Sequence, residues 1–305
     1  VYDKDQLFAL RDADGEAVPC QVLPLVFDEQ GKLRWVLLDF QTDLHAGATR
    51  RFSRVPGRAT ATADPKLQVR RTDAGVTVET GAFTVSKKAP LSLLTTASAA
   101  GKPVVTGGSA SYTDALTGET YRAGSPTRIE VNYAGPMRVT LTVRGGFVGD
   151  DKTVLGYIAR ITAWAGRSDV HVKYSLANSN PDHYCWRLIR DSRIELKLAG
   201  RVRESLLGGT EPIEAGPRAE LVATLRTEGR RAAAGACRAY DGGKEVWASE
   251  KGEPAAGWLA ARLPERTVWA CDLHFAANPA RRLGVEDGRL ILGAGMRRPA
   301  DEADA

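Results

Sequence analysis

The stretch MRVTLTVR, at residues 137–144, alternates apolar and polar side chains with a period of two. Successive side chains of a β-strand point to opposite faces of the sheet, so this pattern predicts a strand with one buried and one solvated face. The same alternation recurs in VHVKYSL at residues 170–176 and in IELKL at residues 194–198. We therefore expect a chain built of β-strands, with the apolar residues of 137–144 in the core and its arginines and threonines in solvent.

Other strand and turn signals point the same way. The segment LRWVLLDF, at residues 33–40, is apolar on both faces, which predicts a fully buried strand. Turn-forming pairs separate the predicted strands at short intervals, as at Asp14-Gly15 and Asp287-Gly288. Only residues 219–231 could form a helix, because their Leu and Val residues fit one helical face, but their threonines and Gly229 lower the helix propensity.

The tryptophans fall into two groups by their surroundings. Trp35 and Trp164 lie within apolar strands and are expected in the core. Trp247 and Trp258 lie near glycine-rich turns and are freer to be exposed. An exposed tryptophan could stack on a sugar ring.

Length and composition describe a globular chain of two domains. The 305 residues are 43% hydrophobic and 26% charged, close to globular averages. A Pro- and Gly-containing stretch at residues 54–65 looks like a connection, and we place the domain boundary near residue 72, which gives domains at residues 1–72 and 73–305. The first residues, VYDK, carry neither an initiator methionine nor a signal peptide, so we expect a mature, trimmed or partial chain.

The charge balance limits the classes of partner. Forty-two Lys and Arg against 37 Asp and Glu give a formal net charge of +5, which favours acidic partners weakly. The basic residues are spread along the strands without a nucleic-acid motif, so we expect no nucleic-acid partner and consider an acidic polysaccharide more suitable. No run of 18 apolar residues occurs, so no membrane span is predicted.

The spacing of the cysteines and acidic residues matches no metal-binding motif, so we expect neither a metal site nor a cofactor. Cys20, Cys185, Cys237 and Cys271 have no CxxC spacing. They are either separate buried thiols or partners in one or two disulfides of an exported protein. If a disulfide exists, we expect it between Cys237 and Cys271, which both lie in predicted strands of the second domain.

Several segments carry a resemblance to the exo-rhamnogalacturonan lyase-like family. They are DGEAVPCQ at residues 14–21, GKLRWVLLDF at 31–40, TGAFTV at 80–85, NYAGPMRV at 132–139, RITAWAGRSDV at 160–170 and WACDLHF at 269–275. The resemblance implies an all-β fold, with a small N-terminal RIFT-type β-barrel followed by a large antiparallel β-sandwich, and a secreted or periplasmic location. In full-length members a helical toroid follows and completes the active site, and the resemblance implies that this toroid would begin where the present sequence stops. Gly31-Lys32-Leu33 also replaces the family's Asp-Gly-Ser turn, so the resemblance supports the fold more than lyase chemistry.

The densest supply of reactive side chains is DHYCWR, at residues 182–187, after the loop signal NSNP. Arg187 could hold a carboxylate, His183 or Tyr184 could move a proton, and Trp186 could stack on a sugar. Strand alternation offers another explanation, in which Tyr184 and Trp186 pack inward while His183 and Arg187 coat the sheet. The catalytic residues remain unknown, because a β-eliminating lyase needs a cation, a base and an acid together.

Three functional hypotheses follow. In the first, the chain is a secreted β protein that binds or frames an acidic polysaccharide. In the second, it is a structural protein that assembles through unfilled sheet edges, which invite pairing with another copy. In the third, it is a fragment of a polysaccharide lyase that needs a C-terminal region for activity.

Overall fold

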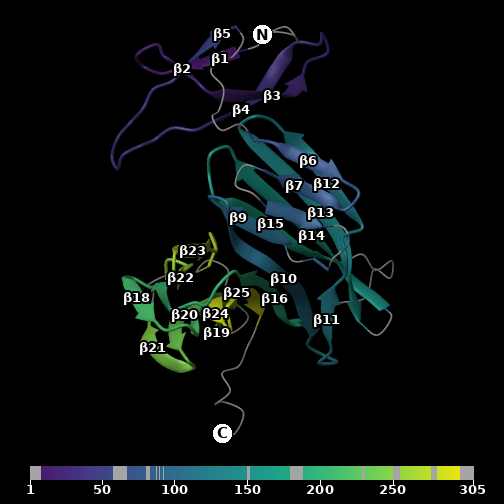
Figure 1. Ribbon diagram of the computed structural model, residues 1–305, viewed down its shortest axis with the longest axis vertical. Helices are drawn as coiled ribbons and strands as arrows, with labels where there is room; N and C mark the ends of the chain where they lie inside the picture. The colour runs from purple at the N-terminus through teal and green to yellow at the C-terminus, as the bar shows by residue number, and fades with distance from the viewer. Residues whose placement is uncertain are drawn as a thin grey trace. The chain divides into compact units, whose positions relative to one another are not determined.

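A computed structural model describes residues 8–57, 67–79, 83–86, 88, 90–91, 93–149, 152–178, 188–228, 231–249, 255–275 and 280–295 (Figure 1). The described residues form antiparallel β-strands and turns and contain no helix. The predicted all-β fold class is therefore confirmed. No membrane-crossing helix occurs in this part of the chain.

The N-terminal strands form two small sheets. A three-stranded sheet has the order β2-β1-β5, and β3 pairs with β4 in a two-stranded sheet. The strands are β1 (Phe8–Arg11), β2 (Ala17–Val18), β3 (Cys20–Phe27), β4 (Leu33–Phe40) and β5 (Ser53–Pro56). Phe8, Leu10, Cys20 and Leu33 are their buried apolar side chains.

The remaining described strands form a 16-stranded and a four-stranded sheet. The four-stranded sheet has the order β18-β17-β22-β23, and the long path of the larger sheet is β15-β14-β13-β11-β10-β16-β25-β24-β19-β20-β21. The strands are β6 (Val69–Thr72), β7 (Gly75–Val78), β8 (Phe83–Ser86), β9 (Thr96–Ala99), β10 (Lys102–Asp114), β11 (Thr120–Ala123), β12 (Arg128–Ala134), β13 (Arg138–Gly149), β14 (Lys152–Trp164), β15 (Val170–Ala177), β16 (Ile189–Leu198), β17 (Glu204–Gly208), β18 (Pro212–Ala215), β19 (Ala219–Glu228), β20 (Arg231–Asp241), β21 (Lys244–Ala248), β22 (Trp258–Leu263), β23 (Arg266–Cys271), β24 (Arg281–Glu286) and β25 (Arg289–Gly295).

By its internal packing the chain divides into two compact units. The first consists of Val1–Ala82, Ile129–Val143 and Ala159–Tyr174, and the second of the remaining segments. Each unit is assembled from separate stretches of sequence, so this division does not test a single cut in the chain. The predicted domain boundary near residue 72 stays a prediction.

In the first unit, one face of β13, together with Met137 just before it, is buried as the alternation predicts. Met137, Val139, Leu141 and Val143 are all 4% exposed or less. The other face is less solvated than expected, because Thr142 is buried and Thr140 is half-buried. The Thr142 hydroxyl donates a hydrogen bond to Asn132 on β12. A side chain of the neighbouring strand, rather than water, is therefore its partner. The expectation of one wet face is thus wrong for this segment.

In the second unit, two sheets pack as a sandwich. Strand β17 lies against β19, and β22 lies against β24. The inward side chains Leu207 and Leu259 of the small sheet, and Leu221 and Leu283 of the large one, are at most 1% exposed. Tertiary burial of alternate residues on both sheets therefore builds this core.

The structure decides one open alternative, the possible helix at residues 219–231, and overturns one expectation, the burial of Trp35. Residues 219–228 form strand β19, because Leu221 and its neighbours pair with β20 on one side and β24 on the other. Pairing on both sides overrides a weak helical pattern. Trp35 is 68% exposed, because β4 belongs to a two-stranded sheet and only part of its apolar surface is covered. Trp164, Trp247 and Trp258 are half-buried.

Candidate functional site

The predicted binding residues His183, Tyr184, Trp186 and Arg187 lie outside the described residues. Their role therefore stays a prediction. The segment that contains them leads directly into β16, whose first residues are described. On that strand Asp191 is half-buried and Arg190 is exposed.

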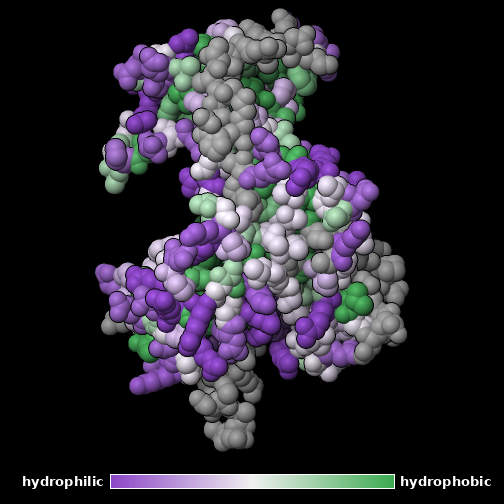
Figure 2. All heavy atoms as spheres, in the orientation of Figure 1, coloured by the Kyte–Doolittle hydropathy of each residue, from purple (hydrophilic) through white to green (hydrophobic). Residues whose placement is uncertain are grey.

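Strand β16 separates charged from apolar side chains by its pleat. Ile194, Leu196 and Leu198 are buried, as the alternation predicted. The residues between them, Glu195 and Lys197, lie on the opposite face with Asp191 and Arg193. On the face of the molecule shown in Figure 2, hydrophilic side chains gather over the part of the second unit where Figure 1 places β18, β20 and β21.

Antiparallel pairing continues this charged surface across three more strands. We use the name charged face for the set Asp191, Arg193, Glu195 and Lys197 on β16, Arg289 on β25, Arg282 on β24 and Glu220 on β19. The register places Arg193 opposite Gly293 on β25, and Gly293 opposite Arg282 on β24. A glycine between the two arginines leaves room for both side chains.

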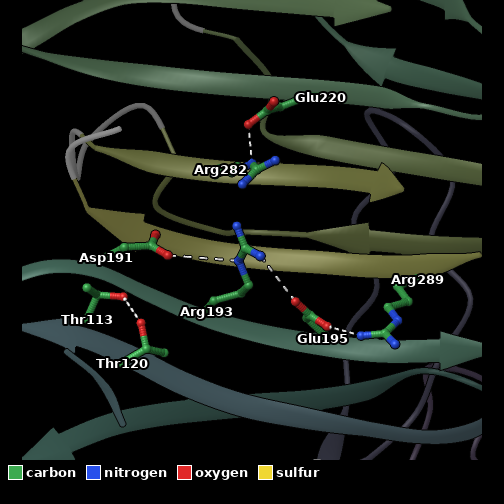
Figure 3. Close-up of polar contacts among 8 residues, drawn as sticks. All are labelled: Thr113, Thr120, Asp191, Arg193, Glu195, Glu220, Arg282 and Arg289. Atoms are coloured by element: carbon green, nitrogen blue, oxygen red, sulfur yellow. Dashed lines mark hydrogen bonds and ion pairs between the residues drawn. The ribbon is translucent and has the colours of Figure 1, made fainter. Parts of the chain in front are cut away.

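Ion pairs fix the orientation of these groups. Arg193 Nη1 lies 3.3 Å from Glu195 Oε1, and Arg193 Nε lies 3.9 Å from Asp191 Oδ2. Glu195 Oε2 accepts a hydrogen bond from Arg289 Nη1 at 2.6 Å. Figure 3 shows the guanidinium group of Arg193 between Asp191 and Glu195, with Arg282 directed toward Glu220 on the neighbouring strands. Within the charged face, Asp191, Arg193, Glu195 and Arg289 are thus linked by successive ion pairs, and Arg282 and Glu220 form a separate pair.

Two threonines lie beside the charged face, next to Asp191. Thr113 on β10 lies opposite Asp191 on β16 and opposite Thr120 on β11. The Thr113 and Thr120 hydroxyl oxygens are 3.0 Å apart and share a hydrogen bond (Figure 3). Thr113 is buried and Thr120 is exposed, so the Thr120 hydroxyl is the neutral donor and acceptor at this end of the charged face.

The electrostatics of the charged face centre on Glu195. Burial by itself would raise the pKa of the Glu195 carboxyl, but the hydrogen bonds from Arg289 and Arg193, with their positive charges, hold that pKa below its ordinary value. Lys197 lies directly opposite Arg289 in the register, and its ammonium group forms no ion pair within the described part of the chain. Like charges placed opposite each other on a sheet are unfavourable unless an anion lies between them.

A second polar cluster lies inside the first unit. Arg138 Nε lies 3.2 Å from Asp39 Oδ2, and the Arg138 guanidinium carbon lies 5.1 Å from the centre of the Tyr133 ring. Gln21 Oε1 accepts hydrogen bonds from the backbone nitrogens of Met137 at 2.8 Å and of Arg138 at 3.2 Å. Burial raises the pKa of Asp39, and the charge of Arg138 offsets this only in part. Because its groups bind one another, this cluster joins β3 and β4 to β13 rather than facing a ligand.

The cysteines do not form the expected bridge. Cys237 is a buried free thiol on β20, and Cys271 is an exposed free thiol on β23. The predicted Cys237–Cys271 disulfide is therefore wrong, because Cys237 is buried whereas the Cys271 side chain lies on the exposed face of its sheet. Cys20 is also a buried free thiol, and Cys185 lies outside the described residues. Within the described ranges, no group of three His, Cys, Asp or Glu side chains is placed to hold a metal ion.

Comparison with known proteins identifies no relative. No protein-family model matches the chain, and no curated protein matches its sequence significantly. The resemblance to the exo-rhamnogalacturonan lyase-like family thus rests on the sequence segments alone.

Proposed function

We propose that this chain binds an acidic polysaccharide on the charged face. The observation that carries the proposal is the pair Lys197 and Arg289, two cations opposite each other on adjacent strands, with Glu195 already shared between Arg289 and Arg193. Across β16 and β25 three cations thus face two carboxylates, those of Asp191 and Glu195. A carboxylate of the ligand would relieve the repulsion between Lys197 and Arg289.

The remaining groups suit the hydroxyls of a sugar chain. A hydroxyl group donates one hydrogen bond and accepts others, so it can bind between a guanidinium donor and a carboxylate acceptor. The charged face alternates such donors and acceptors, and the mutual ion pairs hold them in place before a ligand arrives. Lys197 and Arg289 are the exposed members of the charged face, whereas the side chains of Glu195, Arg282 and Glu220 are at most 24% exposed, so a ligand would first meet the two cations.

The sequence resemblance supports the same class of ligand. The predicted residues His183, Tyr184, Trp186 and Arg187, which were chosen for their reactive side chains, precede β16 in the chain by a few positions. A secreted or periplasmic location would give the protein access to such a polymer, and this location is part of the proposal.

Isothermal titration calorimetry with polygalacturonate and rhamnogalacturonan fragments tests the proposal. The variant Lys197→Ala/Arg289→Ala removes the two opposed cations and leaves Glu195 paired with Arg193. We expect its affinity for acidic fragments to fall by tenfold to a hundredfold, the usual range for a lost charge-assisted contact. Added salt should weaken the parent's binding and have less effect on the variant.

Arg167→Ala is the matched control. Arg167 is an equally exposed arginine, ion-paired with Asp169 and located in the first unit, so its removal should leave affinity unchanged. The proposal is wrong if the parent shows no saturable heat at millimolar acidic oligosaccharide. It is also wrong if the double variant, with an unchanged melting temperature, binds as tightly as the parent.

A further inference from the structure

The outer face of the four-stranded sheet carries two tryptophans in contact. Trp258 on β22 and Trp269 on the neighbouring strand β23 have ring centres 5.1 Å apart and ring planes inclined by 45°. The register places Ala260 opposite Trp269 and Cys271 opposite Trp258, so these four side chains share one face. Trp269 is 62% exposed.

Glycine residues make room for Trp258, the less exposed of the two tryptophans. A Cβ atom at Gly208 on β17 would lie 2.6 Å from the Trp258 indole, so the ring lies directly on the backbone of Gly208. A Cβ atom at Gly209 would likewise lie 3.2 Å from the indole of Trp247. The Gly208-Gly209 pair thus makes room for aromatic rings, and the position of Trp258 is set by backbone contact before any ligand binds.

Polar groups border the two rings on the same face. Arg262 on β22 and Glu204 on β17 form an ion pair of 2.5 Å, and their side chains are 47% and 55% exposed. Thr267, which is exposed on β23, lies opposite Arg262 and two residues from Trp269. The two aromatic rings therefore have hydrogen-bond donors and acceptors beside them. We use the name tryptophan platform for Trp258, Trp269, Arg262, Glu204 and Thr267.

We infer that the tryptophan platform binds a pyranose ring of a neutral carbohydrate. A pyranose presents an apolar C–H face, which stacks on the exposed indole of Trp269, and hydroxyls at its edge, which meet Arg262, Glu204 and Thr267. The charges at this border neutralise each other, so the site has no need of an acidic ligand. This binding site goes beyond the proposed function. It lies on the four-stranded sheet, whereas the charged face lies on the 16-stranded sheet, and it takes a different class of sugar.

The size of the platform argues against a second copy of the chain as the occupant. A tryptophan side chain has roughly 150–250 Å² of surface, so the exposed part of Trp269 is roughly 100–150 Å². Each partner in a stable protein complex buries about 800 Å². A single sugar ring matches the available apolar area far better.

Tryptophan fluorescence titration with neutral glucose-, galactose- and rhamnose-containing oligosaccharides tests the inference. We expect saturable binding by the parent and at least a tenfold loss of affinity in Trp269→Ala. Trp269→Tyr should restore part of the affinity, because tyrosine keeps an aromatic face. Trp35→Ala is the matched control, since Trp35 is a comparably exposed tryptophan at 68% and lies in the first unit.

The exposed thiol of Cys271 supplies an independent measurement. In a Cys185→Ser variant, Cys271 is the accessible thiol among the described cysteines, because Cys20 and Cys237 are buried. Burial and the charge of Asp272 raise the pKa of Cys271, so alkylation is best followed at alkaline pH. Saturating oligosaccharide should slow the alkylation of Cys271 several-fold.

The outcomes separate this inference from the proposed function. Trp269→Ala should keep its affinity for acidic fragments, and Lys197→Ala/Arg289→Ala should keep its affinity for neutral sugars. The inference fails if no neutral sugar binds the parent, if Trp269→Ala binds as the parent does, or if bound sugar leaves Cys271 alkylation unchanged. Self-association that disappears in Trp269→Ala, without sugar binding, would also overturn it.

Discussion

Gly135 lies where the carboxamide group of Gln21 occupies the space that a Cβ atom would need. The same carboxamide oxygen accepts hydrogen bonds from the backbone nitrogens of Met137 and Arg138. Gly135→Ala should displace Gln21 and leave buried donors without their acceptor, at a cost of about 1–3 kcal/mol in the free energy of unfolding. Urea denaturation of parent and variant measures this loss.

Gly156→Ala is the control for this prediction. Its added Cβ atom would meet its nearest neighbours at 3.4 Å, an ordinary van der Waals distance, so the free energy of unfolding should change little. Equal losses in the two variants would mean that displacement of Gln21 is not the cause, since the lower entropy of the unfolded chain would by itself stabilise both variants.

At the scale of the element, strand β13 offers a test of register. Val139 is fully buried, so Val139→Asp would place an unpaired charge in the core and should cost about 3 kcal/mol or more. Thr140 is half-buried, and its hydroxyl oxygen lies 3.2 Å from that of Thr162, so Thr140→Asp should cost about 1 kcal/mol. Thermal melts of the two variants give the comparison. A larger loss for Thr140→Asp would show that the faces of β13 are reversed.

Features that depend on the sequence of a single strand could be predicted, whereas features that depend on its neighbouring strands could not. Alternation correctly placed the buried residues of β13 and β16, because the pleat of a strand is a local property. The exposure of Trp35 could not be predicted, because it depends on how many strands cover β4. The strand at residues 219–228 was likewise obscured, because its stability comes from two neighbours distant in the sequence.

The candidate site shows the same limit. The outward position of Glu195 and Lys197 follows from the alternation of β16. Their partners Arg289, Arg282 and Glu220 join them only through the strand order β16-β25-β24-β19. Hydrophobic periodicity predicts which face a residue occupies and carries no information about which strand lies beside it.

For the whole molecule, two carboxyls give opposite pH dependences. The folded state holds the pKa of Glu195 below its ordinary value of 4.5, so Glu195 contributes stability above that pH and loses it as the pH falls through the folded pKa. The folded state raises the pKa of Asp39 above 3.8, so Asp39 favours folding at low pH and loses that contribution as the pH rises.

Two conservative variants test these signs. Glu195→Gln should lose less stability than the parent between pH 5 and pH 3, because it no longer takes up a proton on unfolding. Asp39→Asn should lose more stability than the parent over the same range, because an opposing contribution is gone. Denaturation curves across these pH values give both slopes. Identical slopes for all three proteins would contradict the assigned shifts.

The position of β25 in the sheet has a consequence for how the chain is made. Strand β25 lies between β16 and β24, although it follows β16 by about ninety residues. During synthesis the facing edges of β16 and β24 therefore stay open until residues 289–295 have left the ribosome. Open strand edges pair readily with other chains, so the nascent protein passes through an aggregation-prone stage. A chaperone that shields those two edges would act on the yield of folded protein without contacting its final surface.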